Sequence, residues 1–144
     1  MARLILSLVI LCGNLQAVAS AAELSGHWRF VAVRYAGTER PPPNPDLALI
    51  FEFEKDGSDR LLWSRKGIPG GCERRAWYQY ANDLLAEVVT WSNPANIAEC
   101  QADPDMQVGR QSMTPLRLVS GRLELDMSVA DQKLTYLWQR EDNP

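Results

Sequence analysis

Apolar and polar side chains alternate along most of the sequence that follows residue 26. Alternation with a period of two places one face of a strand on a core and the other in water. Gly, Pro, Asn and Asp punctuate the alternating segments at regular intervals, as they do between strands. The pattern predicts eight strands, at residues 28–35, 47–54, 60–66, 72–81, 84–92, 111–119, 122–129 and 133–140.

Most of the predicted connections are short turns, and two are long. Residues 36–46 contain the run Pro41-Pro42-Pro43-Asn44-Pro45, which cannot pair as an inner strand and predicts a stiff surface loop. Residues 95–108 are polar and irregular, with a helical turn expected at residues 96–101. Consecutive strands joined by short turns favour an antiparallel up-and-down barrel, because closure removes exposed edges. The interior of an eight-stranded barrel is either filled by side chains or holds one small ligand.

The N-terminus has the pattern of a secretory leader. Arg3 precedes an apolar run at residues 4–12, and small residues follow at residues 17–22. This pattern predicts a signal peptide over residues 1–22, cleaved after Ala22 or after Ala21, and one domain over residues 23–144. The expected location is therefore the periplasm or the outside of the cell. The net charge of −3 gives no basic excess for nucleic acid, and we expect no transmembrane segment in the mature protein.

Two cysteines, Cys72 and Cys100, remain after removal of the leader. An exported protein meets an oxidising compartment, so this pair predicts one disulfide. Closing a loop of about 29 residues stabilises a fold by about 3–4 kcal/mol in the chain-entropy model. A metal site is not expected, because His27 is the only histidine and no Cys-x-x-Cys motif occurs.

Two short motifs at opposite ends of the predicted domain carry a resemblance to a known family. Gly26-x-Trp28 stands at the start of the first strand, and Arg140 ends the last strand in phase with its apolar face. With these motifs and eight strands, the protein resembles the calycin superfamily, the lipocalins and their relatives. The resemblance implies that Trp28 closes the base of the barrel, that Arg140 packs over it, and that the Pro-rich loop lids the opposite end.

A second resemblance is confined to residues 22–28. This string is similar to the start of the small periplasmic inhibitors of secreted metalloproteases, which are eight-stranded barrels with one disulfide. In those inhibitors the N-terminal residues enter the protease cleft, which implies such a role for residues 23–25. Their cysteines lie nearer the N-terminus, whereas Cys72 and Cys100 lie in the middle of this sequence.

Aromatic residues on several strands have two interpretations. They either pack a core or line a pocket for an apolar or ring-containing ligand. The candidate ligand-binding residues are Phe51, Trp63, Tyr78, Tyr80, Trp91, Tyr136 and Trp138. Arg65, Lys66, Arg74 and Arg75 form a local positive cluster, which is either a solvated face or a contact for an anionic head group or acidic protein.

Motifs for catalysis are missing from the sequence. We find no nucleophile elbow, Gly-rich phosphate loop or metal-binding string, and therefore expect no enzymatic activity and no cofactor. The sequence predicts an exported, lipocalin-like barrel that binds a small apolar or amphipathic molecule. The alternative is a protein-binding module that inhibits a secreted or host enzyme such as a metalloprotease.

Overall fold

Strands make up nearly all of the regular structure. The computed structural model describes residues 21–129 and 131–141. The strands are β1 (Gly26–Tyr35), β2 (Thr38–Arg40), β3 (Leu47–Phe53), β4 (Ser58–Arg65), β5 (Gly71–Ala81), β6 (Leu84–Ser92), β7 (Gln111–Val119), β8 (Arg122–Val129) and β9 (Gln132–Glu141). Three short helical segments accompany them: α1 (Ala21–Leu24), α2 (Ala98–Gln101) and the 3-10 turn η1 (Pro104–Met106).

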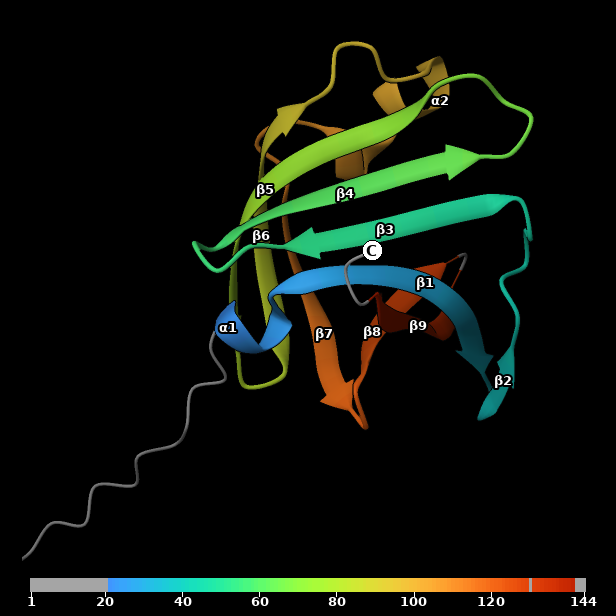
Figure 1. Cartoon of the computed structure of the whole chain (residues 1–144), viewed down its shortest axis with the longest axis vertical. Helices are drawn as coiled ribbons and strands as arrows, with labels where there is room; N and C mark the ends of the chain where they lie inside the picture. The colour runs from blue at the N-terminus through green and yellow to red at the C-terminus, as the bar shows by residue number, and fades with distance from the viewer. Residues whose placement is uncertain (1–20, 130, 142–144) are drawn as a thin grey trace, which may run out of the picture.

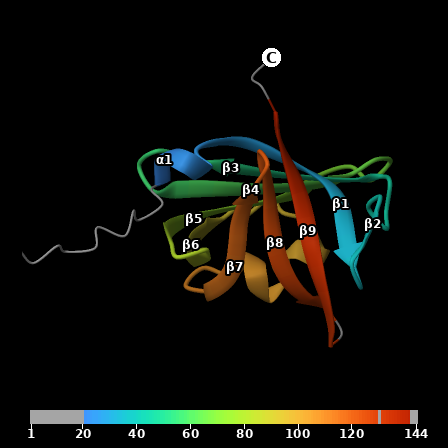
Figure 2. The ribbon, with the colours of Figure 1, turned by 90° about the horizontal axis from the view of Figure 1, so that it is seen from below.

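The sheet closes on itself. Its strand order is β2-β1-β3-β4-β5-β6-β7-β8-β9, every pairing is antiparallel, and β1 also pairs with β9 along residues 27–34. Figure 1 shows β1 curving from α1 toward β2, and Figure 2 shows β8 and β9 running steeply across β3 and β4. The predicted eight-stranded antiparallel barrel is therefore confirmed, with β2 as one extra strand.

The extra strand lies inside a segment that the sequence pattern assigned to a loop. β1 continues past the barrel into a tight turn at Ala36 and Gly37, which both have positive φ values, 47° and 77°. Two successive positive φ values match a type I′ hairpin turn. β2 then pairs with the end of β1 over residues 33–35. All of its side chains are exposed, so no apolar alternation marks it in the sequence.

Aromatic and aliphatic side chains fill one half of the barrel. The core cluster includes Trp28, Phe30, Phe53 and Tyr78, and Leu24 of α1 packs into it with no exposed surface. The rings of Phe51 and Phe53 stack with centroids 4.4 Å apart. This end of the barrel, where α1 lies, is closed by packing.

A disulfide ties the long β6–β7 connection to the opposite end of the barrel. Cys72 of β5 and Cys100 of α2 are bonded, with their Cα atoms 5.9 Å apart, as the sequence predicted. Met106 of η1 is buried against this disulfide. The connection is therefore an ordered part of the wall at that end.

The predicted leader, residues 1–22, lies outside the described residues except for Ala21 and Ala22 of α1. Over the described ranges, no helix has the length and apolar character needed to cross a membrane.

Candidate functional site

Trp28 and Arg140 meet at the closed end of the barrel. The Arg140 guanidinium carbon lies 4.4 Å from the centre of the Trp28 ring, and Trp28 has no exposed surface. Gly26 makes this approach possible: a Cβ atom there would lie 3.1 Å from Arg140 Nη1, and its φ of 133° is a conformation that favours glycine. The Gly-x-Trp motif thus leaves room for the arginine that covers the tryptophan.

The residues that precede this motif belong to the same closure. Arg140 donates hydrogen bonds from Nη1 to the Ser25 carbonyl at 2.7 Å and from Nη2 to the Glu23 carbonyl at 2.9 Å. Trp28 Nε1 donates to the Leu24 carbonyl at 2.7 Å. Residues 23–25 are therefore held against the base of the barrel.

A cavity of about 660 Å³ occupies the other half of the barrel. Its volume lies within the range of roughly 300–1,000 Å³ that is usual for small-molecule sites. Aromatic side chains from four positions face it: Phe51, Trp63, Tyr136 and Trp138. Tyr136 packs on Phe30 with ring centroids 4.8 Å apart, and Trp138 meets Phe51 edge to face at 5.8 Å. The rings that line the cavity are thus held in place by the core beneath it.

Four of the seven predicted ligand-binding residues, Phe51, Trp63, Tyr136 and Trp138, therefore line the cavity. Tyr78 and Tyr80 are buried but do not line the cavity, and the Tyr78 hydroxyl lies 3.2 Å from the Ala21 carbonyl oxygen of α1, at the closed end. The Tyr78 hydroxyl donates to the Glu54 carbonyl at 2.8 Å, and the Tyr80 hydroxyl lies 3.2 Å from the Leu116 carbonyl oxygen. Burial raises the pKa of each phenol to about 12, so both stay neutral. They belong to the core and not to the cavity wall.

Trp91 lies on the outer surface and does not reach the cavity. The β5–β6 register shifts between Arg75 and Ala76, which pairs Trp91 with Arg75. Its side chain is 37% exposed, and the Arg75 guanidinium lies 5.2 Å from its ring centre. The sequence pattern could not show this, because a bulge changes the face of every residue beyond it.

The predicted positive cluster is divided between the two faces of the sheet. Arg75 and Lys66 are exposed, but Arg74 is only 5% exposed and points into the barrel. The interpretation of Arg74 as part of a surface patch is therefore wrong. On β5 it shares the inward face with Ala76 and Tyr78, which follows from strand alternation.

Arg74 joins two buried carboxylates, and this polar cluster was missed at the sequence level. Its Nη1 donates to Asp59 Oδ1 at 3.0 Å and its Nη2 donates to Glu87 Oε1 at 2.7 Å. Burial and the nearby Glu87 carboxylate raise the pKa of Asp59 to about 7, although Arg74 acts in the opposite direction. The sequence does contain a signal for this cluster. Asp59 is in phase with Leu61, and Glu87 is in phase with Leu85, so alternation places both carboxylates on the apolar faces of their strands.

The cavity mouth is formed by the β6–β7 connection and not by the Pro-rich loop. Asp103, Asp105, Met106 and Arg110 line the cavity, whereas no residue of the segment 40–46 does. Met106 packs against the disulfide and faces inward. The β6–β7 connection therefore covers the end of the barrel where the resemblance to the lipocalins led us to expect the Pro-rich loop. The mouth is acidic and carries one guanidinium.

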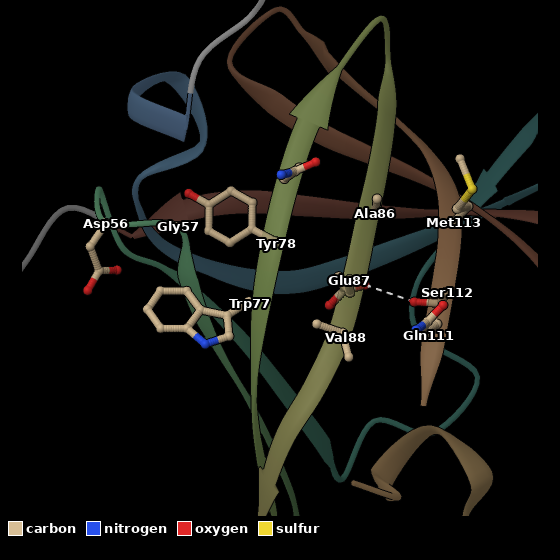
Figure 3. Close-up of a pocket in the computed structure, with 11 residues that line it drawn as sticks. Asp56, Gly57, Trp77, Tyr78, Ala86, Glu87, Val88, Gln111, Ser112 and Met113 are labelled. Atoms are coloured by element: carbon tan, nitrogen blue, oxygen red, sulfur yellow. Dashed lines mark hydrogen bonds between the residues drawn. The ribbon is translucent and has the colours of Figure 1, made fainter. Parts of the chain in front are cut away.

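A second hollow lies on the outer face of β5, β6 and β7. Figure 3 shows Trp77, Val88 and Met113 around it, together with the Glu87–Ser112 hydrogen bond between β6 and β7. Trp77 is 53% exposed and Met113 is 69% exposed, so this is an open surface hollow. The barrel cavity encloses a small molecule better and is the stronger candidate site.

Among the residues that the structure describes, no group of three or more His, Cys, Asp or Glu side chains is arranged to hold a metal ion. His27 lies at the base, with Nδ1 3.4 Å from Glu52 Oε1.

Comparison with known proteins identifies the architecture. No protein-family model and no curated protein matches the sequence. Among solved structures, a lipocalin-like protein from Bacteroides uniformis matches with a TM-score of 0.56 and 16% identity, over 83% of this chain and 99% of that one. An uncharacterised protein from Bacteroides eggerthii matches with a TM-score of 0.50 and 14% identity, over 81% and 98% of the two chains. The protein therefore has a lipocalin-like fold, as the Gly26-x-Trp28 and Arg140 motifs indicated.

Proposed function

We propose that this protein binds one small apolar or amphipathic molecule inside its barrel and has no catalytic activity. The observation that carries the proposal is the cavity of about 660 Å³ walled by Phe51, Trp63, Tyr136 and Trp138. Rings of this kind offer a large apolar contact area, and the polar groups among them can orient a ligand.

We further propose that the protein acts after export, in the periplasm or outside the cell. The support is the leader pattern at residues 1–22 together with the Cys72–Cys100 disulfide. Structural disulfides persist in oxidising compartments and are rare where thiols are kept reduced.

The alternative, inhibition of a protease through residues 23–25, finds no support in the arrangement of those residues. Leu24 is buried in the core, and the carbonyl groups of Glu23 and Ser25 accept hydrogen bonds from Arg140. Insertion into a protease cleft would require these contacts to break. Deleting residues 23–25 would also remove Leu24 from the core, so that deletion cannot separate inhibition from folding.

The proposal can be tested with the neutral fluorescent probe N-phenyl-1-naphthylamine and a matched pair of variants. Val89→Phe adds bulk to a residue that lines the cavity and is 4% exposed, whereas Val119→Phe makes the same change at a position that is 42% exposed. We expect the wild type and Val119→Phe to enhance probe fluorescence, and Val89→Phe to bind at least about tenfold more weakly.

Thermal denaturation shows whether both variants are folded. Native mass spectrometry of protein purified from its own compartment is the second measurement, because a retained small molecule is expected there. A wild type that neither enhances the probe nor retains a molecule overturns the proposal, as does equal probe binding by Val89→Phe and Val119→Phe.

A further inference from the structure

The carboxylates around the cavity raise the question of what charge the ligand carries. Resting on the proposed function, we propose that the ligand is an amine whose positive charge lies against Glu87 and whose apolar part lies among the aromatic side chains. This ligand class is supported by the cavity, by the position of Glu87 on its wall, and by the imbalance of buried charge behind it.

Carboxylates outnumber guanidinium groups on the cavity surface. The acidic side chains that line it are Glu87, Asp103, Asp105 and Asp126, and the basic ones are Arg74 and Arg110. Asp126 is paired by Arg117, with nitrogen–oxygen distances of 2.9 and 3.0 Å, and Asp105 lies 3.4 Å from Arg110. The acidic excess that remains favours a cation in a partly enclosed site.

Glu87 has one carboxylate oxygen available to a ligand. Its Oε1 accepts from Arg74 at 2.7 Å, while its Oε2 has only the Ser112 hydroxyl, at 3.5 Å, as a partner among the described residues. Glu87 and Ser112 both line the cavity. An ammonium group beside them would donate a short, charge-assisted hydrogen bond to Oε2.

One guanidinium cannot neutralise the two carboxylates that share it. The Asp59 side chain has no exposed surface, and its Oδ2 has no hydrogen-bond partner among the described residues. Arg74 Nε also has no hydrogen-bond partner among the described residues. An acceptor group on a ligand could therefore accept a hydrogen bond from this one donor, but it would face several carboxylates. A buried charge without compensation is costly, and a second cation near Glu87 would supply that compensation.

The surroundings of Glu87 already hold one cation, the Arg74 guanidinium. The Arg74 guanidinium lies between Asp59 and Glu87 and 5.6 Å from the centre of the Phe51 ring, which combines carboxylates with an aromatic face. Aromatic faces attract alkylammonium groups as well as guanidinium groups. An amine ligand would extend the same chemistry into the cavity, toward Trp63, Tyr136 and Trp138.

The same cluster predicts that binding is linked to a proton. The charged groups around Asp59 are Arg74 of β5 and Glu87 of β6, and the nearby Tyr78 phenol stays neutral. Near neutral pH the proton on Asp59 offsets part of the excess negative charge. A cation that binds nearby favours the ionised carboxylate, so amine binding should release this proton and strengthen as the pH rises.

Three indole compounds with the same ring separate the ligand classes by calorimetry on the disulfide-bonded protein: tryptamine is cationic, tryptophol is neutral and indole-3-propionate is anionic. At about pH 8 we expect tryptamine to bind at least about tenfold more tightly than tryptophol, and the anion to bind most weakly. Tryptamine binding should weaken about tenfold between about pH 8 and pH 6, whereas tryptophol binding should not change. Titrations in two buffers of different ionisation enthalpy measure the released proton.

Glu87→Gln tests the residue directly, with Glu54→Gln at an exposed position as the control. We expect Glu87→Gln to remove the preference for tryptamine and Glu54→Gln to keep it. The wild-type pH series and proton release test the inference even if Glu87→Gln does not fold. Equal, pH-independent binding of tryptamine and tryptophol overturns the amine inference and leaves the proposed function standing. Failure of all three compounds overturns the amine inference, and the proposed function falls with it only if N-phenyl-1-naphthylamine also fails to bind.

Discussion

The buried Asp59 carboxyl should make the stability of this protein fall as the pH rises, and Asp59→Asn should remove that dependence. Asn keeps an oxygen that can accept the Arg74 Nη1 hydrogen bond, now 3.0 Å long, but it cannot ionise. Burial and Glu87 raise the pKa of Asp59 from 3.8 to about 7 in the folded protein. The folded state therefore binds this proton more tightly than the unfolded state does.

The sign and size follow from this difference. A raised folded-state pKa contributes stability below about pH 4, and the contribution is lost as the pH rises through about 7. The difference between the folded and unfolded pKa of Asp59 corresponds to about 4 kcal/mol in the free energy of unfolding. About 3 kcal/mol of this stability is lost between about pH 4.5 and pH 8. The free energy of unfolding of Asp59→Asn, minus that of the wild type, should therefore increase by about 3 kcal/mol over this interval.

Urea denaturation at several pH values, with the disulfide intact, measures the difference. Subtracting the wild-type curve removes the titration of other groups, which both proteins share. Glu54→Gln, at an exposed position, is the control and should follow the wild type at every pH. A stability difference that stays constant from about pH 4.5 to pH 8, or that decreases, would contradict a raised pKa of Asp59 in the folded protein.

Three further predictions concern the closed end and the disulfide. Arg140→Ala should lower the free energy of unfolding by about 2 kcal/mol in urea denaturation, since it removes the contact with Trp28 and two hydrogen bonds to backbone carbonyls; an unchanged midpoint contradicts this. Leu24→Ala should cost about 2–5 kcal/mol by the same assay, because the side chain is fully buried, and a cost below about 1 kcal/mol would argue against α1 as part of the core. Replacing Cys72 and Cys100 with Ser should cost about 3–4 kcal/mol and reduce amide protection at residues 98–106 in hydrogen exchange, whereas protection that survives would show that packing alone holds the segment.

The sequence determined most strand positions because alternation and turn residues are local signals. β6, β7 and β8 begin and end at the predicted residues, and the turn before β6 contains Asn82 and Asp83, which both adopt positive φ. β2 was missed because all three of its side chains are exposed, which leaves no periodic pattern to recognise. Its existence depends on pairing with β1, a contact that the local sequence of residues 38–40 does not encode.

Some residues of the candidate site could also be predicted from the sequence, and others could not. Inward-facing aromatic positions on regular strands, such as Trp63 and Trp138, could be read from alternation. Whether such a residue lines the cavity or packs the closed end depends on its height in the barrel, and Tyr78 and Tyr80 lie on the side of the closed end. Trp91 faces outward because of a bulge, which one strand alone does not reveal.

Local sequence patterns were enough to predict the antiparallel barrel and the disulfide pair, and the resemblance to the lipocalins implied the contact of Trp28 with Arg140. The position of Arg74 inside the barrel, between Asp59 and Glu87, became clear only from the folded structure, as did the lining of the mouth by the β6–β7 connection. The two kinds of feature differ in the sequence separation over which their interactions act. Strand periodicity acts between neighbours along the sequence, whereas charge compensation and cavity shape depend on side chains that only barrel closure brings together.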